Sequence, residues 1–315
     1  MNTEIITPKN EPHWLELRTN DITSTDVSAL FNISPYLTHF ELWHRKKNKT
    51  VVELEPSEVM KWGQRLQDAI AHGVAEDNGW EIRRMAEYIR IPELRIGSSF
   101  DYELFPLEYN PKDVNFTELG ILEIKNVFGL IFKDQWLEDE GGNIEAPPHI
   151  EIQVQHQLLV SDRAFAYIAT LVSGNKVVLL KREPNPSIQQ AIKTKCAEFW
   201  ASIDSGEEPK PDFSQDAEFI GKLMNYAEPG KVVDFRSDTS FQEKCEEHKR
   251  LGDIEKDAKT KRDAIKAELL TKIGDAEKVL GDGFSITAGL IAPAHISYDR
   301  DGYRMFRINW PRGKK

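Results

Sequence analysis

Gly120-Ile121-Leu122-Glu123-Ile124-Lys125-Asn126 is the stretch of sequence on which the predicted fold depends. Its apolar residues predict a buried strand. Glu123 and Lys125 are two positions apart, so both side chains point to the same face of that strand. Loss of one partner from a buried charge pair costs about 3–5 kcal/mol. Each of these two charges therefore needs the other, a metal ion or a ligand.

A second predicted strand, residues 96–104, carries an acid, Asp101. Two carboxylates and a lysine on neighbouring strands are the groups that a metal-dependent phosphodiesterase requires. The carboxylates bind Mg²⁺, a hard cation that prefers oxygen ligands, and the bound metal activates water and stabilises the leaving oxygen. Lys125 would orient the water or neutralise charge on the phosphate. The alternative is a structural salt bridge between strands, and the motif alone does not decide between the two.

Composition indicates a globular protein. The chain has 315 residues, 40% of them hydrophobic and 30% charged, which is enough for one large domain or two. The formal net charge of -11 argues against a generally basic, nucleic-acid-binding surface. It does not exclude a local basic lining beside an acidic metal site.

Targeting segments and cysteine motifs indicate the compartment in which a protein works. No apolar run is long enough to span a bilayer, and residues 1–10 lack the apolar core of a secretory signal. We therefore expect a cytoplasmic protein with no membrane partner. The chain has 2 cysteines, Cys196 and Cys245, which supports neither a disulfide framework nor a cysteine zinc site.

The N-terminal region predicts a short helix at residues 11–18, followed by a hydroxyl-rich and acidic segment at residues 22–26. Within that segment, Thr25 precedes a second helical pattern at residues 27–31. Thr25 is interpreted either as the N-cap of that helix or as a phosphate contact at its N-terminus. The residues alone favour the cap.

Two further helices are predicted before the strands. The first, residues 38–47, ends in a basic cluster between His44 and Lys49, which either complements the helix dipole or steers DNA. The second, residues 57–79, places Gln67 at the edge of its buried face. The apolar face of this second helix is predicted to contain Met60, Gly63, Leu66, Ile70 and Val74.

An amide-rich helix is predicted at residues 150–160, where Gln153 and Gln157 share one face and Gln155 lies between them. Glutamines on a wet helix surface are the plain alternative, although the apolar neighbours indicate that the helix packs. The remaining predicted elements are a strand at 88–91, a turn at 110–113, a helix at 130–138, a hairpin of 164–172 and 176–181 around Gly174-Asn175, and a helix at 187–203.

The sequence changes character after residue 205. Residues 206–214 are acidic and proline-bearing, which predicts a linker between a domain at 1–205 and an extension at 215–315. In the extension, residues 241–273 predict a long exposed helix or a helical hairpin broken near Gly252, with a solvated charged face. Residues 285–291 and 303–310 predict short strands.

Taken together, these motifs resemble the phage lambda-type exonuclease family, also called YqaJ-type viral recombinases, within the PD-(D/E)XK nucleases. The resemblance covers residues 11–203. It implies a mixed α/β (α+β) class with a restriction-endonuclease-like core, in which helices flank a central mixed sheet, plus a C-terminal helical extension and short strands. The motifs that carry it are residues 14–18, 22–25 and 62–63, Asp101, and residues 120–125 and 153–158.

The resemblance implies a metal-dependent 5′-to-3′ exonuclease. Such an enzyme degrades one strand of linear double-stranded DNA and supplies single strands to an annealing protein during phage-type recombination. It also implies one or two Mg²⁺ ions per site, with Mn²⁺ as an alternative, a trimeric ring of subunits, and a phage or prophage protein in a bacterial host.

By position, the resemblance assigns roles to individual residues of this chain. Asp101 and Glu123 become metal ligands together with the Ile124 carbonyl, and Lys125 becomes the catalytic lysine. Gln153 becomes the supporting glutamine, with Gln155 and Gln157 as neighbours. Arg18 and Thr25 fall where the family binds the terminal 5′-phosphate, so the resemblance favours the phosphate role of Thr25 over the cap.

One position departs from the family pattern. The family has a glutamate four residues after the glycine at position 63, and this chain has Gln67 there, followed by Asp68. Gln67 can offer an oxygen ligand, but it lacks the charge that Asp68 would have to supply. The competing hypotheses are therefore a catalytically weakened protein that binds DNA ends on the same fold, and an endonuclease of the same superfamily.

Overall fold

The computed structural model describes residues 2–51, 57–105, 119–295, 297 and 302–308. It divides into two compact units, Met1–Phe219 and Ile220–Lys315. The predicted turn at 110–113 lies outside the described residues. None of the described helices combines the length and the apolar character that a membrane crossing needs.

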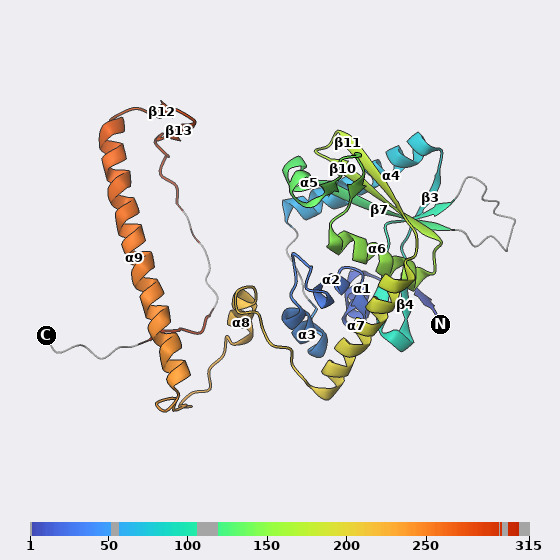
Figure 1. Ribbon diagram of the computed structural model, residues 1–315, viewed down its shortest axis with the longest axis horizontal. Helices are drawn as coiled ribbons and strands as arrows, with labels where there is room; N and C mark the ends of the chain where they lie inside the picture. Colours follow the sequence, from blue (N-terminus) through green and yellow to red (C-terminus); the bar gives the residue numbers. More distant parts are fainter. Residues whose placement is uncertain (1, 52–56, 106–118, 296, 298–301, 309–315) are drawn as a thin grey trace. The chain divides into compact units, whose positions relative to one another are not determined.

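A five-stranded mixed sheet, in the order β11-β10-β7-β6-β3, forms the centre of the first unit (Figure 1). Residues 120–126 lie in β7, which runs parallel to β10 and antiparallel to β6. The strands are β3 (Glu81–Arg84), β6 (Tyr102–Phe105), β7 (Gly120–Val127), β10 (Phe165–Val172) and β11 (Lys176–Arg182). The predicted hairpin of β10 and β11 is confirmed, and its turn places Ser173 and Gly174 at φ 51° and 76°.

A four-stranded sheet in the order β1-β4-β5-β2 lies in the same unit. Its strands are β1 (Glu4–Ile6), β2 (Ile22–Thr23), β4 (Tyr88–Ile91) and β5 (Ile96–Ser98), and the 3-10 turn η1 (Pro92–Leu94) joins β4 to β5. The short strands β8 (Leu137–Glu138) and β9 (Ile144–Glu145) pair separately.

Helices cover both faces of the central sheet. The helices of this unit are α1 (Glu11–Thr19), α2 (Val27–Leu30), α3 (His39–Lys47), α4 (Glu58–Asn78), α5 (Gly129–Gln135), α6 (Pro148–Ser161) and α7 (Pro186–Ser205). α4 begins and ends as predicted, because Ser57 caps its N-terminus and Gly79 takes the left-handed conformation, with φ 67°, at its C-terminus.

The alternation of side chains along β7 divides the apolar core into two clusters. Leu122 and Ile124 pack with Ile70 and Val74 of α4, whereas Ile121 belongs to the cluster that contains the apolar residues of α6. Glu123 and Lys125 have the same parity as Ile121, so they face α6. The predicted class, a central mixed sheet flanked by helices with a C-terminal helical extension and short strands, is confirmed.

The prediction of one strand over residues 96–104 is wrong. β5 ends at Ser98 and β6 begins at Tyr102, and the two strands belong to different sheets. Asp101 lies in the bend between them, where its carboxylate accepts a hydrogen bond from the Ile124 N–H at 2.8 Å. Beyond the Tyr102–Leu122 pair, the Asp101 side chain takes the place of a backbone partner for the Ile124 N–H of β7. The backbone of the neighbouring segment can therefore turn at Asp101.

The predicted apolar face of α4 is confirmed only in its second half. Ile70 and Val74 are 6% and 3% exposed, whereas Met60 is 46% exposed. The buried residues of α4 begin at Ile70, and Leu66 is partly buried against the same apolar cluster.

The second unit contains α9 (Thr239–Ile273) and the hairpin of β12 (Lys278–Gly281) and β13 (Phe284–Thr287), and α8 (Ala217–Leu223) crosses the division between the units. α9 is continuous through Gly252 and has no buried residue, so the predicted long exposed helix is confirmed and the alternative of a hairpin broken near Gly252 is wrong. Residues 303–308, the described part of the predicted strand at 303–310, form no strand, and the Arg304 N–H donates to the Asn225 side chain at 2.6 Å.

The predicted linker, residues 206–214, belongs to the first compact unit. Glu208 is 3.2 Å from His44 Nε2, and Asp216 accepts a hydrogen bond from Thr38 at 2.5 Å. The predicted domain boundaries at residues 205 and 215 stay a prediction, since the division at Phe219 does not test what each part does.

Candidate active site

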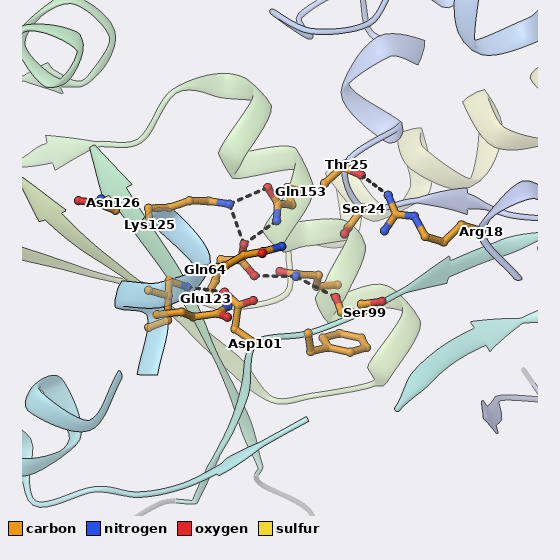
Figure 2. Close-up of a pocket in the computed structure, with 15 residues that line it drawn as sticks. Arg18, Ser24, Thr25, Gln64, Ser99, Asp101, Glu123, Lys125, Asn126 and Gln153 are labelled. Atoms are coloured by element: carbon orange, nitrogen blue, oxygen red, sulfur yellow. Dashed lines mark hydrogen bonds and ion pairs between the residues drawn. The ribbon is translucent and has the colours of Figure 1, made fainter. Parts of the chain in front are cut away.

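A cleft of about 310 Å³ opens where β7, α4, α6 and the segment after β5 meet (Figure 2). Both halves of the predicted site contribute to it, because the acid and lysine residues and the Arg18–Thr25 pair line the same cavity. Its lining comprises Arg18, Ser24, Thr25, Gly63, Gln64, Gln67, Ser99, Phe100, Asp101, Glu123, Ile124, Lys125, Asn126, Gln153 and Gln157.

Glu123 is the most extensively bonded of these residues and is only 4% exposed. Its Oε1 atom accepts hydrogen bonds from Gln153 Nε2 at 2.6 Å and from Lys125 Nζ at 2.7 Å. Its Oε2 atom accepts one from Gln157 Nε2 at 2.8 Å. The carboxylate is therefore held in one orientation by donors from two elements, β7 and α6.

Lys125 is held on the same face of β7. Its Nζ atom bonds to Glu123 and also donates to Gln153 Oε1 at 3.2 Å. Burial alone would lower the pKa of Lys125, but the adjacent Glu123 carboxylate outweighs burial and raises it. The ammonium group therefore stays charged at neutral pH.

Asp101 reaches the cleft from the bend between the two sheets. Burial, with a further contribution from the Glu123 charge, raises the pKa of Asp101 to about 7. The hydrogen bond from Ile124 N–H opposes that increase. A buried carboxylate pair of this kind favours the binding of a cation between the two groups.

The Ile124 carbonyl faces the same edge of β7 as Asp101. The N–H and C=O groups of one strand residue point to the same neighbouring strand, and the Ile124 N–H bonds to Asp101 Oδ2. The predicted backbone ligand therefore lies on the side of the strand from which Asp101 approaches.

Gln67 and Asp68 have separate surroundings. Gln67 lines the cleft and forms a hydrogen bond with the Asp101 carboxylate that lowers the pKa of Asp101. Asp68 does not line the cleft and bonds instead to Arg84 Nη1 at 3.0 Å and to the Tyr102 hydroxyl. Asp68 therefore does not supply to the cleft the negative charge that Gln67 lacks.

Arg18 and Thr25 lie together at the other end of the cleft (Figure 2). Arg18 Nη2 donates to Thr25 Oγ1 at 3.1 Å, and the guanidinium carbon lies 4.7 Å from the centroid of the Trp14 ring. The N-cap position of α2 belongs to Asp26, so the interpretation of Thr25 as that N-cap is wrong. The Thr25 hydroxyl is instead hydrogen-bonded to Arg18 and to the Thr23 hydroxyl, at 3.1 Å each.

The basic cluster at the end of α3 has mainly structural contacts. Lys46 is 8% exposed, Arg45 pairs with Glu41 at 2.5 Å, and Lys47 Nζ donates to the Ile203 carbonyl at 2.8 Å. These bonds favour the helix-end interpretation over DNA steering for the three residues.

Several cleft residues were missed by the sequence analysis. Gln64 precedes Gln67 by three positions, so the helical period could have placed it on the same face. Ser24, Ser99, Phe100 and Asn126 carried no comparable signal. Gln155 points away from the cleft, since its side chain bonds to the Glu183 carbonyl at 2.9 Å and accepts from Asn185 N–H at 2.8 Å.

The donors in the cleft suit a hard cation. Asp101 and Glu123 supply carboxylate oxygens, and Ile124 supplies a carbonyl oxygen on the same side. Oxygen donors of this type are the ligands that Mg²⁺ and Mn²⁺ accept. Among the residues the structure describes, no group of three or more His, Cys, Asp or Glu side chains forms a cation site.

These features define a mixed α/β protein whose central strand carries a carboxylate and a lysine into a cleft that a second carboxylate enters. Residues 13–164 match the family model of the YqaJ-like viral recombinase domain. This part of the chain, which contains the residues of the cleft, is therefore similar to the YqaJ-like viral recombinases.

Individual proteins and solved structures are also similar to this chain. The chain is 28% identical over 264 residues to the uncharacterized protein YqaJ of Bacillus subtilis (strain 168), covering 81% of this chain and 77% of that protein. Among solved structures, it is similar to the alkaline exonuclease LHK-Exo of Laribacter hongkongensis, with a TM-score of 0.47, 15% identity, and coverage of 68% of this chain and 100% of that one. A phage related exonuclease of Haemophilus somnus 129PT matches with a TM-score of 0.39, 12% identity, and coverage of 59% and 94%.

Proposed function

We propose that this protein is a metal-dependent exonuclease that degrades one strand of linear double-stranded DNA from its 5′ end. The observation that carries the proposal is the arrangement of Glu123, Lys125 and Gln153, bonded to one another in a cleft that Asp101 also enters. The similarity of residues 13–164 to the YqaJ-like viral recombinase domain supports it, because single strands are the material of recombination by annealing.

Asp101, Glu123 and the Ile124 carbonyl would hold the Mg²⁺ ion, or Mn²⁺ in its place. When bound, such an ion lowers the pKa of a water ligand and neutralises charge on the phosphate. Gln153 and Gln157 orient Glu123 by donating to separate oxygens of its carboxylate. Lys125, charged and held 2.7 Å from Glu123, is placed to orient the attacking water and to stabilise negative charge as the phosphodiester bond breaks.

Arg18 and Thr25 form the proposed contact for the terminal 5′-phosphate. A guanidinium group and a hydroxyl, 3.1 Å apart, offer several donors to one phosphate group. They line the cleft that contains the acid pair, so a strand end held there would lie near the cleaved bond. This placement supports digestion from the 5′ end.

Two parts of the proposal rest on the family resemblance. These are the trimeric ring of subunits around the DNA and the transfer of the product strand to a single-strand annealing protein. A phage or prophage origin in a bacterial host is proposed on the same ground.

A second candidate function is DNA-end binding with weakened catalysis, and the amide at Gln67 favours it. The cleft contains Gln67 where a third acid would stand, and Asp68 is bonded elsewhere. An endonuclease of the same fold is the third candidate. The three candidate functions differ in whether the protein needs a DNA end and in whether it cleaves DNA catalytically.

Digestion of end-labelled linear and closed circular DNA separates these candidates. With Mg²⁺, we expect release of nucleotides from linear duplexes that carry a 5′-phosphate, no cleavage of circles, and no reaction after chelation. Cleavage of circles would indicate an endonuclease. Binding of ends without digestion in Mg²⁺ or Mn²⁺ would overturn the exonuclease proposal in favour of the end-binding function.

Replacement of Arg18 by alanine tests the phosphate contact. Hydrogen bonds to charged groups contribute about 1.5–3 kcal/mol, so we expect kcat/KM on 5′-phosphorylated ends to fall by roughly 10- to 100-fold. Rates on 5′-hydroxyl ends should change little, and the preference for phosphate should disappear. If Arg18→Ala keeps the wild-type preference, the 5′-phosphate lies elsewhere; Arg65→Ala, on α4 outside the cleft lining, serves as the matched control.

A further inference from the structure

The charges that line the cleft balance one another. Asp101 and Glu123 supply two negative charges, and Arg18 and Lys125 supply two positive charges. The other polar side chains of the described lining are amides and hydroxyls, among them Gln64, Gln67, Gln153 and Gln157. Before any ion binds, the fully ionised cleft is therefore formally neutral.

The face of α4 that borders the cleft contributes amides. Gln67 forms its hydrogen bond with the Asp101 carboxylate, so its side chain lies beside the acid pair. A carboxylate at this position would be the third acid of the cleft. Gln67 fills the same volume without the charge.

Asp68 cannot move into this role without losing its own partners. It bonds to Arg84 Nη1 and to the hydroxyl of Tyr102, a residue that is 2% exposed. Residues 67 and 68 differ by about 100° around the helix axis, which directs their side chains to different neighbours. The charge of Asp68 is therefore used between α4 and strands β3 and β6.

Two divalent ions in one cleft repel each other four times as strongly as two single charges at the same distance. Two-metal sites hold their ions about 3.5–4 Å apart and need anionic ligands to offset that repulsion. One ion can be held by both carboxylates of this cleft and the Ile124 carbonyl. A second ion would have to share the same two carboxylates, with Lys125 beside them.

We infer that the side chains of this cleft hold one divalent cation, and that Gln67 is the residue that excludes a second. The inference rests on the proposed function, because it assumes that the acid pair binds the metal. It predicts a change of stoichiometry from a single substitution, Gln67→Glu, which adds a carboxylate beside Asp101.

The test is a titration of the full-length, DNA-free protein with Mn²⁺, in which free Mn²⁺ is measured by electron paramagnetic resonance. We expect one bound ion per chain for the wild type and two for Gln67→Glu. Gln67→Ala, which removes the amide without adding a ligand, should still bind one. The matched control Asp68→Asn should also bind one ion, with an affinity close to that of the wild type.

Each other result overturns the inference. Two ions on the wild type would show that the amide-lined site already suffices for a pair. One ion on a Gln67→Glu protein that gives a wild-type circular dichroism spectrum would show that this position does not control the number of ions. A loss of binding in Asp68→Asn would make Asp68 a ligand.

The outcome is separable from that of the proposed function. A protein that binds one Mn²⁺ and leaves linear DNA intact would retain the inference and refute the exonuclease. A protein that digests linear DNA and binds two ions would do the reverse.

Discussion

Lys125→Met is expected to lower the rate of digestion of 5′-phosphorylated linear DNA by at least about 100-fold, the scale seen when a preorganised donor to a reacting oxygen is removed. Methionine keeps most of the length of the lysine stem and removes the ammonium group that lies 2.7 Å from Glu123. The rate is measured as release of labelled nucleotide under single-turnover conditions, so that product release does not mask the chemical step.

Folding should survive this substitution, because the Glu123 carboxylate still accepts hydrogen bonds from Gln153 and Gln157. Circular dichroism and a thermal melt check that expectation. Lys181→Met is the matched control, since this lysine is exposed on β11 and pairs with Glu183 at the surface. Wild-type digestion by a folded Lys125→Met protein would remove Lys125 from the proposed chemistry.

The central part of the cleft could be predicted from local periodicity. A strand period of two places Glu123 and Lys125 on one face, and a helical spacing of four places Gln153 and Gln157 on one face. The structure brings these two faces together, with Gln153 bonded to both strand residues. Strong local signals of this kind need no knowledge of the rest of the chain.

The position of Asp101 could not be derived in the same way. Residues 96–104 have the composition of a continuous strand, and the break between β5 and β6 depends on the Ile124 N–H, which is 23 residues away in the sequence. The same limit applies to the segment that runs from Arg18, at the end of α1, to Thr25, after β2. Its shape depends on the parallel pairing of β2 with β5 and on Lys46 of α3, which no short-range pattern reveals.

The basic cluster shows how composition alone misleads. Lys46 belongs to a run of cationic residues that suggested a solvated or DNA-steering surface, yet it is almost completely buried. Its Nζ atom donates to the Arg18 carbonyl, the Asp21 carbonyl and Asp26 Oδ2, each at 2.7 Å. Lys46, which the sequence pattern placed at the surface, therefore holds the segment between Arg18 and Asp26, next to the proposed phosphate contact.

Lys46→Met is expected to lower the free energy of unfolding by about 3–5 kcal/mol. It removes the ammonium donor from two carbonyls and from the largely buried Asp26 carboxylate, which keeps the Thr23 N–H as a donor. Burial alone would raise the pKa of Asp26, but Lys46 and Arg18 lower it to about 2. The ion pair therefore stabilises the fold fully above the unfolded pKa of 3.8, and this contribution is lost as the pH falls toward 2. Urea unfolding at pH 7 and at pH 3 measures both effects.

Lys47→Met is the matched control for this prediction, because Lys47 is exposed and makes one hydrogen bond, to the Ile203 carbonyl. It should lose no more than about 0.5–1.5 kcal/mol.

The double variant Lys46→Met/Asp26→Asn should recover part of the lost stability, since it removes the unpaired buried charge. Such a protein would still lack the donor that fixes the Arg18 and Asp21 carbonyls, so its preference for 5′-phosphorylated ends should stay below that of the wild type. A double variant with wild-type stability and wild-type preference would show that Lys46 neither stabilises this loop nor positions Arg18.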